Sequence, residues 1–147
     1  MTTIRLLTPS DRAAWEPLWK GYQSFYEVVI PPETTDLTWA RFHAANEPMH
    51  AFGAFDDDGT LKGIVHAIFH RSTWLPKWTC YLQDLYVEAD QRGLGTGAAL
   101  IERVADLARE HGAGRLYWMT HETNERARRL YDQIAERSGF IQYRKQL

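Results

Sequence analysis

A glycine-rich loop between a buried strand and an amphipathic helix constrains the fold of this chain more than any other segment. Residues 81–87 (YLQDLYV) predict a strand that is largely apolar on both faces, as central strands are. Apolar residues then recur at helical spacing from Leu100 to Ala108 and stop at Gly112, a residue type that commonly ends helices. The loop at residues 92–97 (RGLGTG) joins the two elements. A strand, a glycine turn and a helix in direct succession are typical of the α/β class of folds.

The rest of the chain predicts further strands and helices around this unit. Apolar alternation and the turn residues between segments predict strands at residues 4–7, 49–55, 61–70, 81–87, 115–120 and 140–143. Helical spacing and capping residues predict helices at residues 15–26, 34–45, 97–108 and 124–134. The expected order is therefore β-α-α-β-β-β-α-β-α-β around a mixed α+β sheet. At 147 residues and 44% hydrophobic composition, the chain is expected to form a single domain over residues 1–147.

Charge and hydropathy exclude several classes of function. The chain carries 17 basic and 19 acidic residues and has no basic stripe that could follow a phosphate backbone, so no nucleic-acid partner is expected. The sequence contains no run of about 18 apolar residues, and the N-terminus has no apolar stretch of signal-peptide length. We therefore expect no membrane contact and a cytoplasmic location.

No metal site is expected either. The three aspartates at residues 56–58 precede Gly59 at the tip of a predicted hairpin, where carboxylates are usually solvated. No further ligand lies at a usable spacing from them. Cys80 is the only cysteine and predicts a small hydrophobic residue in a strand rather than a catalytic thiol.

The glycine loop itself predicts an anion site. Gly93, Gly95 and Gly97 let the backbone approach a ligand closely, and amides at the N-terminus of a helix can converge on a negative group. Arg92 adds a positive charge. A flexible turn is the plainer alternative, and the loop also fits the G-x-G-x-x-A pattern of dinucleotide sites. Too little chain follows Thr120 for the doubly wound sheet of dinucleotide folds, which favours another cofactor that carries a pyrophosphate.

The segments YLQDLYV (81–87) and QRGLGTG (91–97), followed by Asn124 and the pair Leu130-Tyr131, resemble the GCN5-related N-acetyltransferase (GNAT) superfamily. The R-x-x-G-x-G loop, the asparagine and the tyrosine fall at the family's relative positions. The chain is most similar to the small acetyltransferases that act on histones, polyamines and similar amines. The resemblance implies a GNAT fold with the fourth and fifth strands splayed, acetyl-CoA as co-substrate, a small-molecule amine as acceptor, and a homodimer.

The resemblance also assigns contacts to the cofactor. It implies that the backbone at Leu85, Tyr86 and Val87 binds the pantetheine arm. It implies that Asn124 contacts the cofactor near Tyr131, which lies two helical turns further on. It implies that the pyrophosphate is held by Arg92, Gly93, Leu94, Gly95, Thr96, Gly97 and Ala98.

Amine acetylation requires a group that removes a proton from the amine and a group that protonates the leaving thiolate. An alkylamine is almost entirely ammonium at pH 7, so a base or desolvation must remove its proton. A strand amide near Leu85 is the implied donor to the oxyanion. Tyr131 is the implied acid, with an ordinary pKa of about 10 against about 8.5 for a thiol. On spacing alone, Tyr131 is more typical of a residue that completes the apolar stripe of its helix.

The base is the point at which the chain departs from the polyamine-type members of the superfamily. They carry a glutamate where Gln83 stands, and an amide cannot accept the proton. Asp84 is the candidate base, acting through a water, although strand alternation predicts that it faces away from Gln83. A structural carboxylate is an equal alternative for Asp84. His121 and Glu122 are further candidates.

Two more groups of residues bear on the acceptor site. Six aromatic residues either wall an acceptor pocket, form a dimer interface or belong to the core: Trp15, Trp19, Tyr22, Tyr26, Trp74 and Trp78. Three acidic residues favour a cationic acceptor if they rim the pocket and are otherwise solvated: Glu27, Glu33 and Asp36.

The sequence therefore predicts an acetyl-CoA-dependent N-acetyltransferase that acts on a small-molecule primary amine by direct attack on the thioester. Two alternatives stay open: an acetyltransferase for protein or peptide lysines, and a catalytically silent acetyl-CoA-binding module. The second alternative arises from Gln83.

Overall fold

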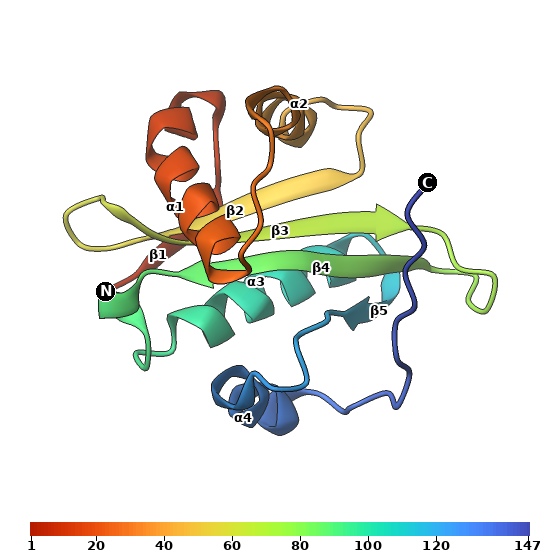
Figure 1. Ribbon diagram of the computed structural model, residues 1–147. Helices are drawn as coiled ribbons and strands as arrows, with labels where there is room; N and C mark the ends of the chain where they lie inside the picture. The colour runs from red at the N-terminus through yellow and green to blue at the C-terminus, as the bar shows by residue number, and fades with distance from the viewer.

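Five β-strands form one mixed sheet in the computed structural model, which describes residues 1–147 (Figure 1). The strands are β1 (Thr3–Leu6), β2 (Met49–Phe55), β3 (Leu61–His70), β4 (Trp78–Val87) and β5 (Ala113–Tyr117). Their order in the sheet follows the chain, with β1 to β4 antiparallel and β5 parallel to β4. The predicted mixed sheet and its central hairpin are confirmed.

Helices cover both faces of this sheet. In Figure 1, α1 (Arg12–Phe25) and α2 (Pro32–Phe42) lie above the sheet, α3 (Thr96–Glu110) lies below it, and α4 (Glu125–Ile134) lies at the bottom. Two short 3-10 turns, η1 (Pro9–Asp11) and η2 (Ala89–Gln91), precede α1 and the glycine loop. None of the helices combines the length and the apolar character needed to cross a membrane.

The helix after the glycine loop, α3, follows the apolar spacing that predicted it. Its buried residues are Thr96, Leu100, Ile101, Val104, Leu107 and Ala108. They recur every three or four positions, so they share one face of the helix and pack on the sheet together. Full burial of each large apolar side chain stabilises the fold by about 1.5–3 kcal/mol. Gly112, with a φ of 70°, follows the helix in the left-handed conformation that glycine adopts without strain.

The sheet separates two hydrophobic cores. The core on the α3 side includes Phe52, Val65, Cys80, Leu82, Leu100 and Val104. The core on the side of α1 and α2 includes Trp15, Leu18, Trp19, Trp39 and Ile64. Cys80 is fully buried, and burial raises the pKa of its thiol to about 11, as expected for a cysteine that serves only as a small hydrophobic residue.

The predicted last strand at residues 140–143 is wrong in this structure. From Glu136 to the C-terminus the chain has neither helix nor strand. Phe140, Ile141 and Tyr143 are 80%, 76% and 88% exposed. A strand forms only when its backbone finds a hydrogen-bonding partner, and the apolar pattern of this segment cannot supply one by itself.

The predicted divergence of the fourth and fifth strands is present. β5 pairs with β4 only over Trp78–Tyr81, through partners from Ala113 to Tyr117. From Leu82 to Val87, β4 therefore has a strand neighbour on the β3 side only. This divergence positions the candidate site.

Candidate active site

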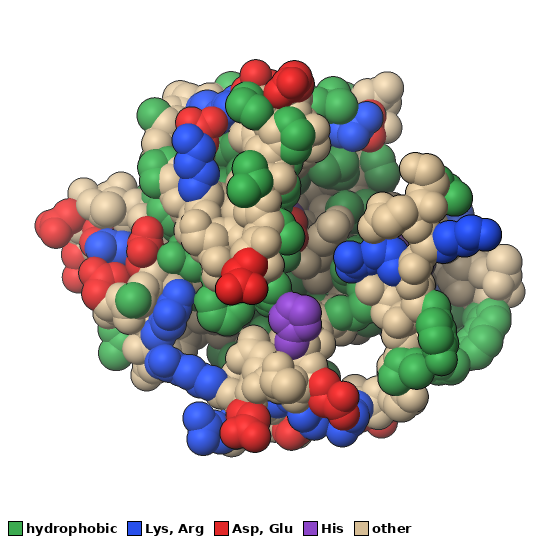
Figure 2. All heavy atoms as spheres, viewed as in Figure 1, with side chains coloured by type: hydrophobic (Ala, Val, Ile, Leu, Met, Phe, Trp, Pro, Cys, Tyr) green, Lys and Arg blue, Asp and Glu red, His purple; other side chains and the backbone are tan.

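The candidate site is built around the edge of β4 that has no strand partner. Backbone N–H and C=O groups on a strand edge need partners, and a ligand that lies along the edge can supply them. Leu85, Tyr86 and Val87, the residues predicted to bind the pantetheine arm, lie on this stretch of β4. Figure 2 shows the same face of the molecule hollowed between the helices above the sheet and the segment that follows α4, with hydrophobic side chains in the hollow.

A β-bulge at Gln83 decides which side chain of β4 faces α1. His66 pairs with Asp84 and Ala67 pairs with Leu82, so Gln83 is an extra residue on β4. Leu82 and Leu85 both pack on the α3 side as a result, whereas Asp84 lies on the α1 side. The predicted strict alternation of faces along β4 is therefore wrong, because one extra residue shifts its phase.

Asp84 is held by a buried histidine that no sequence motif predicted. The Nδ1 atom of His66 lies 2.9 Å from Oδ2 of Asp84, and Nε1 of Trp15 donates to Nε2 of His66 over 3.0 Å. The side chains of His66 and Asp84 are 3% and 12% exposed. The available signal was a lone histidine inside the apolar strand segment 64–69, but only the register of β3 against β4 sets it opposite Asp84.

The charge of Asp84 acts on three nearby tyrosines, Tyr22, Tyr26 and Tyr81. Burial, followed by the charge of Asp84 and a hydrogen bond to it, raises the pKa of Tyr22 well above its ordinary value. Burial and then the charge of Asp84 also raise the pKa values of Tyr26 and Tyr81. All three hydroxyl groups therefore keep their protons at neutral pH. Of the six aromatic residues that the sequence offered for an acceptor pocket, Tyr22 and Tyr26 lie near Asp84.

The other predicted aromatic residues have different places. Trp15 and Trp19 belong to the core under α1. Trp74 is 74% exposed in the connection between β3 and β4. Trp78, at the start of β4, has the Arg71 guanidinium 3.6 Å from its ring centroid.

Tyr131 reaches the same region from α4. Its ring packs edge-on against Trp118, with centroids 5.5 Å apart. Burial, followed by the influence of Tyr26, raises its pKa above the ordinary tyrosine value. Tyr26 thus lies near both residues: the charge of Asp84 raises the pKa of Tyr26, and Tyr26 raises the pKa of Tyr131. The structure brings the two predicted catalytic residues to one region.

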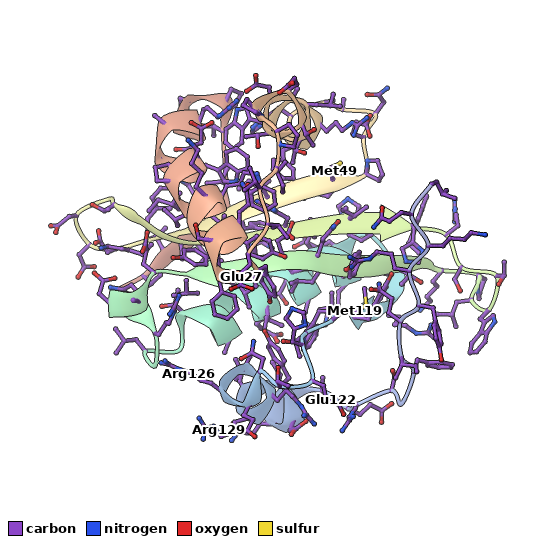
Figure 3. All side chains as sticks on the ribbon, viewed as in Figure 1. Glu27, Met49, Met119, Glu122, Arg126 and Arg129 are labelled. Carbon is purple, nitrogen blue, oxygen red and sulfur yellow. The ribbon has the colours of Figure 1, made fainter.

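The remaining candidates for the base are less well placed. The His121 ring lies 5.5 Å from the Tyr26 ring, at the edge of the same region. Glu122 is turned to the surface, where it pairs with Arg137 at 3.4 Å, and its side chain is 80% exposed. Figure 3 shows Glu122 beside α4, apart from Glu27 at the lower end of α1.

Only one of the three predicted acidic rim residues lies next to the site. Asp36 is bound by Arg12 at 2.6 Å, and Glu33 lies exposed in the first turn of α2. Glu27 lies two residues beyond the end of α1 and has a φ of 54°, which is unusual for a residue with a side chain. It directly follows Tyr26, one of the tyrosines whose pKa the Asp84 charge raises.

The glycine loop has the geometry of an anion site. Gly93 and Gly95 have φ values of 81° and 84°, a conformation that residues with a side chain rarely adopt. Ala99 donates the hydrogen bond that reaches back to the Gly95 carbonyl, at 3.0 Å. The amides of Thr96, Gly97 and Ala98 precede it, so they have no partner inside α3 and are free for a ligand.

The side chains around the loop are also compatible with a pyrophosphate. Arg92 donates from Nε to the Val87 carbonyl at 2.9 Å, which fixes a positive charge beside the loop. A Cβ at Gly93 or Gly95 would meet no atom within 4 Å, so the ligand side of the loop is open. Leu94 is 70% exposed at the tip of the loop, and Thr96 is buried against the sheet. These residues therefore leave space and positive charge for a pyrophosphate.

Asn124 caps α4. Its Oδ1 accepts from the Ala127 amide at 3.4 Å, and its Nδ2 donates to Oγ1 of Thr120 at 3.2 Å. The residue therefore fixes the connection between β5 and α4, two turns before Tyr131. No group of three or more metal-ligating side chains is present in the chain.

An opened sheet beside a glycine loop is the arrangement that the sequence resemblance implies for an N-acetyltransferase, a class of acyltransferase. The chain belongs to the acetyltransferase (GNAT) family, whose family model matches residues 15–135. The predicted family, fold class and enzyme class are confirmed.

Similar proteins are named as N-acetyltransferases with different acceptors. D-amino-acid N-acetyltransferase HPA3 of Saccharomyces cerevisiae is 36% identical over 143 residues, which cover 97% of this chain and 89% of the relative. Thialysine N-epsilon-acetyltransferase of Caenorhabditis elegans is 32% identical over 89 residues, or 60% of this chain and 54% of the relative. The crystal structure of ribosomal-protein-alanine N-acetyltransferase from Brucella melitensis biovar Abortus 2308 matches with a TM-score of 0.83 and 26% identity, over 100% of both chains.

Proposed function

We propose that the chain, acting as a single domain over residues 1–147 in the cytoplasm, transfers an acetyl group from acetyl-CoA to the primary amine of a small molecule. The observation that carries this proposal is the Asp84 carboxylate among three tyrosines, beside the unpaired edge of β4. The similarity to a D-amino-acid N-acetyltransferase over nearly the whole chain supports a small acceptor.

The donor would lie along β4 and across the glycine loop. Bound acetyl-CoA supplies a thioester carbonyl that an amine can attack. Leu85, Tyr86 and Val87 offer backbone groups to its pantetheine arm. The seven residues from Arg92 to Ala98 hold the pyrophosphate through free amides and the Arg92 charge. Asn124 orients the start of α4 against the donor.

Asp84 and Tyr131 divide the proton transfers between them. The acceptor arrives as an ammonium group, and Asp84 attracts it by charge and removes its proton, directly or through a water. Tyr131 donates a proton to the leaving sulfur. Burial raises the pKa of Tyr131, so the phenol remains protonated at neutral pH and is competent as an acid.

The surroundings of Asp84 favour a cationic acceptor. The faces of Tyr22 and Tyr26 can interact with an ammonium group, and the exposed Glu27 adds negative charge at the end of α1. The thialysine acetyltransferases, which match about half of the chain, are named for an amine of this kind.

An acceptor panel tests the proposal. Thiol release from acetyl-CoA would be measured with D- and L-amino acids, lysine analogues, polyamines and amino sugars, alongside peptides with a free N-terminus or lysine. Faster turnover of one small amine than of every peptide is expected. Faster turnover of a peptide would favour the protein-modifying alternative, to which the structural similarity with a ribosomal-protein acetyltransferase points. Binding of acetyl-CoA without turnover of any acceptor would indicate a silent module.

We also propose that the chain forms a homodimer through the segment after α4. Phe140, Ile141 and Tyr143 are strongly exposed, and β5 has a strand partner on one side only. Exposed apolar segments and open strand edges are typical sites of pairing between copies. Light scattering after size exclusion would give the mass of a dimer for the wild type and of a monomer for Phe140→Asp with Ile141→Asp. A wild-type monomer at micromolar concentration would contradict the proposal.

A further inference from the structure

A buried chain of three side chains connects α1 to the candidate base. Trp15 and His66 are 0% and 2% exposed, and His66 lies between the Trp15 indole and the Asp84 carboxylate. The histidine is further enclosed by Trp19 and Phe42, whose ring centroids lie 5.1 Å and 4.6 Å from its own. The hydrogen-bonding atoms of this arrangement are not needed to fill the core, since apolar side chains could occupy the same volume without leaving polar atoms to satisfy.

The partners of His66 determine which of its nitrogens carries the proton. An indole N–H can only donate a hydrogen bond, so Nε2 of His66 must accept from Trp15 and cannot carry a proton of its own. The single ring proton therefore lies on Nδ1 and is donated to Oδ2 of Asp84. A second proton on Nε2 would oppose the Trp15 N–H directly. His66 is thus held neutral and cannot take the proton that Asp84 receives.

The charged and titratable groups around His66 agree with this assignment. Asp84 contributes the one carboxylate from β4, and Tyr22 contributes from α1 a phenol whose pKa burial and the Asp84 charge raise. Arg12, also on α1, lies 5.7 Å from the centroid of the Trp15 ring and is paired with carboxylates of α1 and α2. From α2, His43 packs against Trp39 rather than against His66. Asp84 is therefore the ionisable partner that His66 contacts.

We infer that Trp15 and His66 are positioning residues, which hold the Asp84 carboxylate in one orientation at the acceptor site. His66 binds Oδ2, and the carboxylate therefore cannot rotate about its terminal bond without losing that hydrogen bond. Oδ1 is the oxygen not bound by the imidazole, and it is the one presented to the acceptor amine. This inference deepens the proposed function and rests on it.

Nuclear magnetic resonance of the wild-type protein tests the tautomer without any variant and without activity. Two-bond proton–nitrogen spectra of His66 are expected to show a protonated Nδ1 and an unprotonated Nε2 at neutral pH. Asp84→Ala is expected to shift the Nδ1 proton signal. A neutral imidazole with its proton on Nε2 would overturn the inference whatever the enzyme activity.

Kinetics test whether the orientation matters for catalysis. His66→Phe is expected to lower kcat on the order of 10²-fold, the scale of a misplaced reacting group, with the KM for acetyl-CoA unchanged. His66→Gln keeps one donor and one acceptor and is expected to recover most of the lost kcat. His50→Gln, a change of another partly buried histidine on the neighbouring β2, is the matched control and is expected to keep full activity.

Trp15→Phe separates positioning from simple packing. This change removes the indole donor, so Nε2 of His66 becomes free to bind a proton. The imidazole can then adopt the other tautomer, with its proton on Nε2, and lose its hydrogen bond to Asp84, so kcat is expected to fall and the two-bond spectra are expected to show a protonated Nε2. An unchanged tautomer in Trp15→Phe, together with unchanged kcat in both Trp15→Phe and His66→Phe, would refute a positioning role.

The outcomes separate this inference from the proposed function. A wild type that releases no thiol with any amine, yet shows the Nδ1 tautomer, would contradict the proposed function and leave the buried geometry established. If His66→Phe fails to fold, as judged by circular dichroism, His66→Gln and Trp15→Phe carry the kinetic test. Loss of kcat in His66→Gln as large as in Asp84→Ala would refute the role of the hydrogen bonds.

Discussion

The layer formed by α1 and α2 and the part of the chain after Ala108 differ in how they are packed. The first layer buries Trp15, Trp19 and Trp39 against the sheet. After Ala108, by contrast, no residue of the chain is buried, and α4 contributes only the partly buried Leu130 and Tyr131 to the core. The proposed acceptor side, around Asp84, is therefore built on a well-packed core. The proposed donor side depends in part on elements with few apolar contacts, which are the elements most open to local unfolding.

The largest expected difference between the two regions is in the free energy of unfolding lost when one side chain in each is truncated. Trp39 is 7% exposed and lies 4.6 Å from Trp15 between ring centroids, so Trp39→Ala is expected to lower the free energy of unfolding by about 3–5 kcal/mol. Ile134 in α4 is 45% exposed, and Ile134→Ala is expected to cost less than about 1 kcal/mol. Urea denaturation measures both, and equal losses would remove the contrast between the regions.

The next largest expected effect is the loss of kcat when Tyr131, on the proposed donor side, is replaced. Tyr131→Phe should lower kcat on the order of 10²-fold, about 2.7 kcal/mol, because it removes the proton donor to the thiolate. An acid is active below its pKa, and burial raises the pKa of Tyr131. Wild-type kcat should therefore fall only as the pH rises beyond the ordinary tyrosine value of about 10, and the variant should lose this alkaline limb. Full activity of Tyr131→Phe with an unchanged pH profile would show that another group is the acid.

Acetyl-CoA should reduce the difference between the two regions. At 100 times its dissociation constant, a ligand stabilises the native state by about 2.7 kcal/mol. Hydrogen exchange is expected to slow mainly over residues 92–98 and 113–134, and much less in α1 and α2. Adenosine diphosphate at the same concentration controls for binding of any pyrophosphate. Equal protection of α1, α2 and α4 would mean that acetyl-CoA does not preferentially stabilise the chain after Ala108.

The smallest expected effect concerns the glycine loop. Gly95→Ala places a side chain at a φ of 84° and is expected to cost about 1–2 kcal/mol, with a matching loss of acetyl-CoA affinity of about tenfold. Gly59→Ala, at a φ of 78° on the β2–β3 turn, introduces the same strain far from the site. Calorimetry should show weaker acetyl-CoA binding in the first variant only. Equal acetyl-CoA affinities in both variants would show that the glycine loop does not contribute to binding of the donor.

The parts of the fold that could be predicted from the sequence are those in which the local pattern agrees with the tertiary contacts. The spacing of Leu100, Val104 and Leu107 specifies one face of α3, and the glycines between a strand and a helix specify a turn with positive φ at Gly93 and Gly95. These features depend on neighbours within a few residues. The family resemblance then added Asn124 and Tyr131, whose roles no local pattern reveals.

The parts that could not be predicted depend on how distant segments meet. The extra residue at Gln83 is visible only in the register of β4 against β3, so the neighbours of Asp84 could not be derived from alternation. The link from Trp15 to His66 joins residues 51 positions apart. Residues 140–143 have the composition of a strand, but their pairing depends on the path of the chain after α4.

The extra residue in β4 also has a consequence for engineering. Removing Gln83 would restore regular alternation, with Leu82 and Leu85 on the α3 side and Asp84 still opposite His66. The strand would lose the bend that a bulge imposes and would run straighter beside β5. A deletion of one residue is therefore the shortest route from a sheet that opens between β4 and β5 to one in which the two strands stay paired for longer.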